Sequence, residues 1–402
     1  MAKIAVLGTL DTKGEEHRFL ADAIVEQGHE PVLIDVGGLE SRTATPDVTR
    51  EQVARAAGID LTAIVRRQDR GELVTAMSQA AVEYVKGAVQ RDEFQGIISM
   101  GGSGGTAIAT AAMRALPIGF PKVMVSTMAS GDVQRYVGES DIGMMPSIVD
   151  VSGLNRVSKT IFRRAAGAIC GMVGVSVEST SIRPVIAASM FGNTTECVQL
   201  AQKQLEAAGY EVLVFHATGA GGRTMESLIR SGMISGVLDV TTTEWADELV
   251  GGILNAGSER LDAAAQTGIP AIVVPGCLDM VNFGEPDSIP EKYRGRTIYA
   301  HNPQVTLMRT SVEESQRLGE IIAEKLNQSK GPVTVLLPLK GLSVIGAEGE
   351  AFYSPEADQA LFNALKTNLN PNIPVREIDT VINHPEFARA CVETLLENIS
   401  TP

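Results

Sequence analysis

The chain has 402 residues, of which 48 are acidic and 34 are basic, and its formal net charge at pH 7 is −14. This length exceeds what a single hydrophobic core usually organises, so we expect two or three domains. The negative charge disfavours nucleic acid and anionic membrane as partners, because both are bound by basic surfaces.

No run of eighteen or more apolar residues occurs, and the first residues lead directly into a strand pattern. We therefore expect a cytoplasmic protein without a membrane span or a signal sequence. Four cysteines, Cys170, Cys197, Cys277 and Cys391, are scattered without a Cys-x-x-Cys pair. This spacing argues against a zinc knuckle, a redox pair and a disulfide framework, and it predicts small buried side chains.

Short apolar runs alternate with helical patterns along both halves of the chain. Such runs are typical of strands buried on both faces, as in a parallel sheet covered by helices. The expected strands are residues 4–8, 30–36, 96–100 and 122–126, then 184–191, 211–216, 236–240 and 271–276. The expected helices are residues 15–26, 71–89, 106–115, 157–175, 196–208, 224–231 and 245–255. The alternation predicts α/β domains with doubly wound parallel sheets.

The sequence contains an internal repeat. Residues 4–38 and 185–219 follow one plan at a constant offset of 181 without a gap, so that Glu15 corresponds to Glu196 and Gly28 to Gly209. Further on, GIISMGGSGG (96–105) lies over GVLDVTTTEW (236–245). Internal duplication explains both matches. We therefore expect two Rossmann-like domains, residues 1–180 and 181–402, with a boundary near 176–184.

The last third of the chain predicts the end of the second sheet. After the short strand TIYA (297–300), Pro303 is expected to begin a helix, which places His301 and Asn302 at a strand end. From residue 333 onward the pattern predicts two more β/α units. Ser354 and Pro355 form a favourable start for the helix of the first of these units.

The glycine-rich segment MGGSGGT (100–106) is the strongest local signal, because ligands of open parallel sheets bind outside the carboxyl ends of strands. Its glycines let an anion approach the amides at a helix start. No Gly-Lys-Ser/Thr follows, and the Gly-x-Gly-x-x-Gly spacing is absent, so this is neither a Walker loop nor a dinucleotide fingerprint. The alternative role is a tight turn with close helix packing. The residues expected to bind a phosphate are Gly102, Ser103, Gly104, Gly105 and Thr106.

The loop after the first strand also carries groups that suit a phosphate, namely Thr9, Asp11, Thr12 and Lys13. Asp11 or Thr12 can equally cap the following helix, and Lys13 can be a solvated surface residue. Arg70 precedes the helix at 71–89, where it can complement phosphate charge or lie on the surface as an ordinary arginine.

Polar residues gather after three strands of the second half as well. We consider His216, Glu244 and Asp279 as catalytic residues, with His216 and Glu244 as general acid and base. Taken singly, His216 suits a hydrogen-bonded strand end and Asp279 a turn or cap, and Asp239 and Asp279 together could bind a metal. The expected substrate-binding residues, which would hold a carboxylate or phosphate, are Gly221, Gly222, Arg223, Thr242, Asn282 and His301.

Seven motifs together carry a family resemblance: GTLDTKGEE, GGSGGT, PKVMVSTMASGD, PSIVDVSGLN, FHATGAGGRTMESLI, GVLDVTTTEWADELVGG and PGCLDMVNF. They resemble the family of the tomato mosaic virus resistance protein, with its Tm-type ATP-binding domain, and its bacterial two-domain relatives. The likeness covers essentially the whole chain. It implies an ATP-binding amino-terminal domain, a second Rossmann-like domain and a homo-oligomer. The family's nucleotide loops match at Thr9, Asp11, Thr12, Lys13, Arg70, Gly102, Ser103, Gly104 and Gly105.

Two functions are open at this point. The first is an ATP-dependent transferase or ligase that binds ATP, with magnesium, and acts on a small anionic metabolite at an interdomain cleft. The second is a nucleotide-sensing binding protein without catalysis. Ionisable groups at strand ends favour the enzyme, whereas the lack of a complete catalytic signature favours the sensor. An NAD-dependent dehydrogenase is disfavoured because the dinucleotide fingerprint is missing, although Asp35 ends the second strand where a ribose-binding acid can lie.

Overall fold

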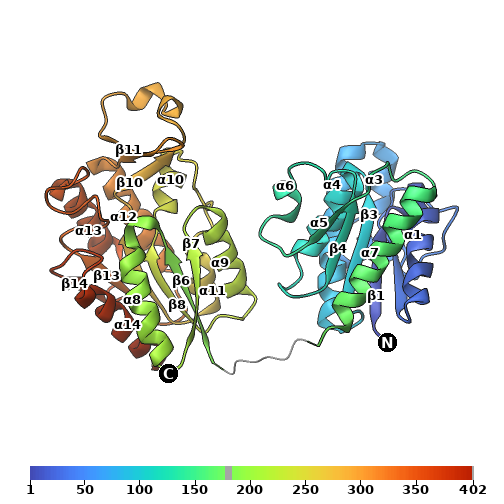
Figure 1. Ribbon diagram of the computed structural model, residues 1–402, viewed down its shortest axis with the longest axis horizontal. Coiled ribbons are helices and arrows are strands. Elements are labelled where there is room, and N and C mark those ends of the chain that lie inside the picture. Colours follow the sequence, from blue (N-terminus) through green and yellow to red (C-terminus); the bar gives the residue numbers. More distant parts are fainter. Residues whose placement is uncertain (177–182, 401–402) are drawn as a thin grey trace. The chain divides into compact units, whose positions relative to one another are not determined.

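The computed structural model describes residues 1–176 and 183–400 (Figure 1). The chain divides into two compact units, Met1–Ser179 and Thr180–Pro402, which we call the first and the second domain. The division lies inside the boundary segment expected from the sequence. Most of that segment falls outside the described residues.

The first domain is a parallel sheet covered by helices on both faces. Its elements are β1 (Lys3–Gly8), α1 (Leu10–Glu26), β2 (Glu30–Asp35), α2 (Arg50–Ala56), α3 (Leu61–Arg67), α4 (Arg70–Gln90), β3 (Gly96–Gly101), α5 (Ser103–Arg114), β4 (Lys122–Ser126), α6 (Gln134–Val137), β5 (Gly143–Pro146) and α7 (Arg156–Gly174). The strand order is β2-β1-β3-β4-β5, with every pairing parallel. Helices α1 and α7 cover one face, and α2, α4 and α5 cover the other.

The second domain repeats this architecture with additions. Its elements are β6 (Val185–Met190), α8 (Thr195–Ala207), β7 (Glu211–His216), α9 (Ala220–Arg230), β8 (Gly236–Thr241), α10 (Glu244–Val250), α11 (Asp262–Thr267), β9 (Ala271–Gly276), β10 (Met280–Phe283), β11 (Ile298–Asn302), β12 (Val305–Arg309), α12 (Val312–Leu326), β13 (Val333–Pro338), α13 (Pro355–Asn368), β14 (Val375–Ile378) and α14 (Pro385–Ser400). A parallel sheet has the order β14-β13-β9-β8-β6-β7, and α8 and α14 cover one of its faces. The strands β10, β12 and β11 form a separate antiparallel sheet.

The two parallel sheets correspond strand by strand, because β7-β6-β8-β9-β13 has the same order as β2-β1-β3-β4-β5. This confirms two Rossmann-like domains with a shared plan. The registers correct the proposed alignment in one place. Ile4 pairs with Gly96 in the first sheet, and Ile186 pairs with Gly236 in the second. Aligning Gly96 with Gly236 therefore aligns Ile4 with Ile186, one residue beyond the position that a constant offset of 181 gives. The repeat consequently contains a gap.

Two predicted helices differ from the structure. The helix expected over 245–255 ends at Val250, because Gly251 adopts φ of 93° and terminates α10. The helix expected to begin at Pro303 is absent: β11 and β12 form an antiparallel hairpin around this residue. Proline suits a turn as well as a helix start, and the β-branched residues Val305 and Thr306 continue as a strand.

The expectations for the end of the second sheet and for the burial of the cysteines are confirmed. The two late β/α units are β13–α13 and β14–α14, and both strands join the second parallel sheet. All four cysteines are buried and free. Among the described residues, no helix has both the length and the apolar character that crossing a membrane requires.

Candidate functional site

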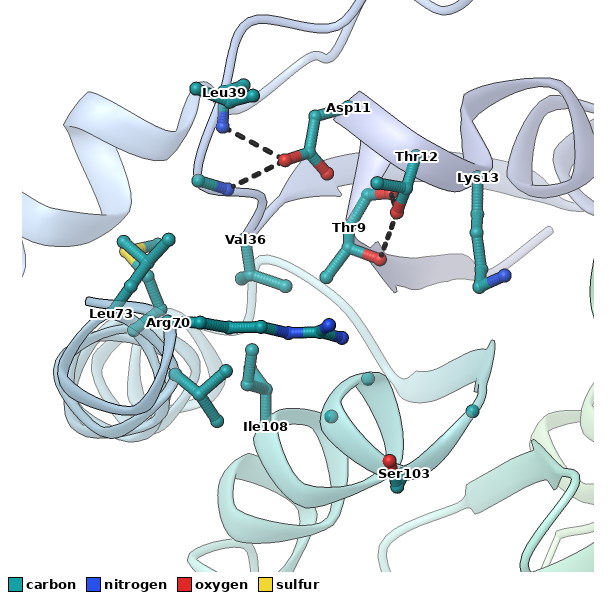
Figure 2. Close-up of a pocket in the computed structure, with 16 residues that line it drawn as sticks. Thr9, Asp11, Thr12, Lys13, Val36, Leu39, Arg70, Leu73, Ser103 and Ile108 are labelled. Carbon is teal, nitrogen blue, oxygen red and sulfur yellow. Dashed lines mark hydrogen bonds between the residues drawn. The ribbon is translucent and has the colours of Figure 1, made fainter. Parts of the chain in front are cut away.

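The first sheet reverses the direction of its connections between β1 and β3. Helix α1 follows β1 onto one face, and α5 follows β3 onto the other. Open α/β sheets bind ligands at such a switch point, outside the carboxyl ends of the strands. A cavity of about 440 Å³ lies here (Figure 2). It is lined by Thr9, Asp11, Thr12, Lys13, Val36, Gly38, Leu39, Arg70, Leu73, Val74, Met77, Gly102, Ser103, Gly104, Gly105 and Ile108.

The amino terminus of α5 forms one wall of the cavity. Gly102 is its N-cap residue, and no side chain caps the helix. The Thr106 amide donates to the Gly102 carbonyl at 2.9 Å. The amides of Ser103, Gly104 and Gly105, one turn earlier, have no acceptor among the described residues. These free amides and the positive end of the helix dipole make this wall suitable for an anion.

The opposite wall is the first turn of α1, which Asp11 ties to the segment after β2. The Oδ2 atom of Asp11 accepts hydrogen bonds from the amides of Gly38 at 3.0 Å and Leu39 at 2.9 Å (Figure 2). The hydroxyl oxygens of Thr9 and Thr12 lie 3.3 Å apart. The Oδ2 atom of Asp11 is therefore committed to main-chain amides, whereas its buried Oδ1 atom has no hydrogen-bond partner among the described residues. The two threonine hydroxyls are further side-chain hydrogen-bonding groups of this wall.

Lys13 lies at the end of this wall. We expected residues 9–13 to form a loop, but α1 already begins at Leu10. Its helical geometry is interrupted at Lys13, where φ is −135° and ψ is 29°. The Lys13 side chain lines the cavity, and its amine donates a hydrogen bond to the carbonyl of Val151. The lysine is thus held at the margin of the cavity by the segment that follows β5.

His17 supports this first turn from behind. Its imidazole is fully buried, and Nδ1 donates a hydrogen bond to the Lys13 carbonyl at 2.7 Å. The ring lies so close to Gly8 that any Cβ at this position would clash with it. Burial lowers the pKa of His17, so the ring is neutral at pH 7.

The cavity has an apolar part as well. Arg70 extends from the start of α4 across the cavity toward Thr9 and Ser103, and it makes no ion pair within the described ranges of the chain (Figure 2). Beyond it the wall consists of apolar side chains from β2, α4 and α5, namely Val36, Leu39, Leu73, Val74, Met77 and Ile108. A ligand bound here meets charge and free amides at one end and apolar contacts at the other.

The structure brings the predicted nucleotide-binding residues together in this one cavity, with the exception of Thr106. The Thr106 hydroxyl lies behind the loop, where it donates to the Gly102 carbonyl at 2.8 Å and is 2.6 Å from the Ser126 hydroxyl. Sequence reasoning missed the apolar wall. A signal for it existed, because Leu73, Val74 and Met77 follow Arg70 at the spacing of one helix face.

Asp35 does not offer the ribose contact of a dehydrogenase. Its carboxylate is buried and accepts the amides of Leu10 at 3.2 Å and Gly37 at 2.8 Å. Burial raises the pKa of Asp35. A residue in this position supports the loop after β1 instead of facing a ligand, which agrees with the missing dinucleotide fingerprint.

The carboxyl edge of the second sheet holds a buried ion-pair cluster. The guanidinium of Arg260, which is 1% exposed, donates two hydrogen bonds to Asp239 at 2.6 and 2.7 Å. It also donates to Glu244 at 2.7 Å and to Glu226 at 3.3 Å. Sequence reasoning missed Arg260, because nothing in its local pattern distinguishes it from a surface arginine. Asp239, considered above as a metal ligand, is an ion-pair partner here.

Glu244 is also bound by the main chain. Its Oε1 accepts the amides of Gly219 at 2.7 Å and Gly222 at 3.1 Å. The residue is 1% exposed. A Cβ on Gly221 would clash with the His216 carbonyl, so this turn is tightly closed. A carboxylate with three donors and no solvent contact is not positioned to act as a general base on a substrate.

Asp279 and Asn282 lie in further buried polar clusters. The Oδ2 atom of Asp279 accepts a hydrogen bond from the Ser343 hydroxyl at 2.6 Å, and burial raises the pKa of Asp279. The main-chain amide of Asn282 donates a hydrogen bond to the Asp247 carboxylate at 2.7 Å. Burial raises the pKa of Asp247 to about 7. Within the described ranges, no group of three or more His, Cys, Asp and Glu side chains has the geometry of a metal site.

The remaining candidates of the second domain differ in their exposure. His216 is exposed at the end of β7, where it stacks on Phe191 with 5.4 Å between the ring centroids. The Arg223 side chain donates a hydrogen bond to a main-chain carbonyl at 3.1 Å. Thr242 is buried, and its hydroxyl donates a hydrogen bond to another main-chain carbonyl at 3.2 Å. His301 is exposed on β11 of the antiparallel sheet. The expected rim of catalytic side chains is therefore not assembled: His216 is exposed, whereas Glu244 and Asp279 are buried and hydrogen-bonded.

Comparison with known proteins covers both domains. The amino-terminal domain of the uncharacterised protein family UPF0261 matches residues 2–178, and its carboxyl-terminal domain matches residues 183–399. The chain belongs to the UPF0261 family. A UPF0261 protein of Clostridium tetani is 51% identical over 98% of both chains, and one of Rhizobium meliloti is 48% identical over 98% of both.

The family extends to plants. The tomato (Solanum lycopersicum) ToMV resistance protein Tm-1(GCR237) is 45% identical over 82% of this chain, although the match covers only 45% of the tomato protein. This confirms the resemblance found in the sequence. One solved structure, a C2-type ketoreductase from a modular polyketide synthase, aligns over 100% of this chain and 90% of its own. It does so at 13% identity with a TM-score of 0.24, which is too low to carry an inference.

The ion-pair cluster of the second domain gives a stability prediction. Replacing Arg260 by Met leaves Asp239 and Glu244 buried without their cation and Glu226 with only the longer contact to Arg230 at 4.0 Å, which we expect to lower the free energy of unfolding by about 3–5 kcal/mol. Urea unfolding followed by circular dichroism measures this. The control is Arg294→Met, which removes an exposed pair with Glu291 and should change stability little. Equal effects of the two substitutions would contradict the role given to Arg260.

His17 predicts a pH dependence of stability. Because its pKa in the folded protein lies below 6.5, the unfolded chain binds the additional proton as pH falls. Stability contributed by neutral His17 is complete above pH 6.5 and decreases below it, by up to about 1.4 kcal/mol per pH unit. We expect His17→Asn to remove this component when unfolding is measured between pH 7.5 and 5. An unchanged slope in the variant would show that other groups cause the dependence.

Proposed function

We propose that the first domain binds ATP in the switch-point cavity. The observation that carries the proposal is the combination, in one cavity, of free α5 amides, the guanidinium of Arg70 and an apolar wall. Main-chain amides and a guanidinium form strong charge-assisted hydrogen bonds with phosphate oxygens. The apolar wall suits the flat face of a base, and about 440 Å³ is within the range of small-molecule sites. The family resemblance, which implies a Tm-type ATP-binding domain, supports the same ligand.

Magnesium would enter this site together with the nucleotide. Asp11 is the one carboxylate among the lining residues, and its Oδ2 atom already accepts the amides of Gly38 and Leu39. Magnesium is usually held by one or two carboxylates, substrate phosphates and water. We therefore propose that the phosphates of ATP supply the principal ligands of the metal, with the protein contributing at most one carboxylate oxygen.

We further propose that ATP acts as a ligand that stabilises the first domain, so that the chain is a nucleotide-sensing binding protein. Among the described residues of the second domain, the expected catalytic groups do not share one exposed site, because Glu244 and Asp279 are buried and hydrogen-bonded. The other function, an ATP-dependent enzyme that acts on a small anionic metabolite, depends on such a group. His216 is the exposed member of the expected catalytic set, so the enzyme function depends on this residue.

Arg70 provides the test of the ATP site. Replacing it by Ala removes a charge-assisted contact of about 1.5–3 kcal/mol, which corresponds to roughly 10- to 100-fold weaker ATP binding. Isothermal titration calorimetry measures the dissociation constant. Arg66→Ala, an exposed arginine of α3 outside the cavity lining, is the matched control and should bind ATP as the wild type does. Identical affinities of both variants, or no ATP binding by the wild type, would reject the site.

A turnover assay separates the sensor from the enzyme. We expect ATP with magnesium to raise the melting temperature of the protein and to stay intact during incubation with a panel of small carboxylates and sugar phosphates. Chromatography of the nucleotides detects hydrolysis or transfer. Release of ADP or AMP that depends on one member of the panel would replace the sensor by the enzyme, and His216→Ala would then be the first variant to assay.

A further inference from the structure

The sheet registers place Gly104 and Glu244 at corresponding positions of the two domains. Strand β3 ends at Gly101 and β8 ends at Thr241, and each pairs in the same register with the first strand of its domain, β1 or β6. Counted from these strand ends, Gly104 in the first domain and Glu244 in the second are each the third residue of the following segment. At the position where the first domain has free amides, the first domain therefore has a glycine and the second domain has a glutamate.

The same comparison identifies the facing wall. Gly38 is the third residue after the end of β2, and Gly219 is the third residue after the end of β7. In the first domain, Gly38 and Gly104 both line the cavity. In the second domain, the carboxylate of Glu244 spans the corresponding gap and accepts the Gly219 amide at 2.7 Å. In the second domain, the Glu244 side chain thus crosses the space that corresponds to the cavity of the first domain.

The contacts of Glu244 are those that a bound anion would make. Its Oε1 atom accepts amides from Gly219 and from Gly222, which lies in the first turn of α9, and its Oε2 atom accepts from Arg260. Main-chain amides at a helix start and a guanidinium are the groups that bind phosphate oxygens. The next residue, Trp245, is also buried, with 5% of its surface exposed.

We propose that Glu244 is a built-in anion, which occupies in the second domain the place that a nucleotide phosphate takes in the first. The chain then binds one nucleotide, and the residue at this position decides which copy of the fold binds it. Glycine leaves the amides free for a ligand, and glutamate occupies the gap from within. The proposal rests on the ATP site proposed above for the first domain.

The test transfers the residue of the second domain into the first. A Cβ on Gly104 would have its nearest neighbour, Val74, at 3.9 Å, so a side chain fits at this position. Titration calorimetry of the full chain should give one ATP per wild-type chain and at least a 100-fold loss of affinity in Gly104→Glu. Gly104→Gln, which has the same size without the charge, should lose clearly less. Melting temperatures without nucleotide show whether both variants are folded.

Each outcome has a defined meaning. Two ATP per wild-type chain, or one site of wild-type affinity left in Gly104→Glu, would overturn the inference while the ATP-binding function stands. Equal losses in the Glu and Gln variants would show that volume decides and would overturn the role of the charge. No ATP binding by the wild type would overturn the proposed function and, with it, this inference. If Gly104→Glu does not fold, the wild-type stoichiometry still decides between one site and two.

Discussion

The opposite directions in which the chain leaves β1 and β3 determine where the first domain can bind a ligand. Parallel strands end at one edge of the sheet, and the two connections pass onto opposite faces, so the starts of α1 and α5 meet across a crevice. Everything else at the site follows from this geometry. The glycines keep the α5 amides free, Asp11 anchors the neighbouring segment, and α4 supplies both Arg70 and an apolar wall.

In the second domain, the same topology carries a different set of groups. Its strands end at an equivalent edge, but there the carboxylate of Glu244 and the guanidinium of Arg260 occupy the glycine amides and the space beside them. Burying Arg260 among three carboxylates is favourable only because hydrogen bonds satisfy almost every donor and acceptor of the cluster. Two sheets of the same strand order can therefore carry different groups at this edge, a cavity with free amides in one domain and internal ion pairs in the other.

The sequence was sufficient for the parts of the fold that depend on local pattern. Buried parallel strands show as apolar runs, and the cavity wall with free amides shows as glycines at a strand end. It failed where tertiary contacts decide. Pro303 starts a hairpin turn because Val305 and Thr306 pair in a sheet, Arg260 is buried by residues distant in the chain, and Glu244 meets glycine amides twenty-five residues away at Gly219. None of these contacts has a signal at short range.

The hydrogen bonds of Asp11 have a mechanical consequence. The single carboxylate of Asp11, at the start of α1, binds the amides of Gly38 and Leu39. This wall of the cavity is therefore one connected unit made from two stretches of chain. Local opening of the segment after β2 must break these bonds together. A molecule that contacts Thr9 or Thr12 therefore restrains the fluctuations of Gly38 and Leu39 without touching them, and the free energy of opening that segment reports on events at the start of α1.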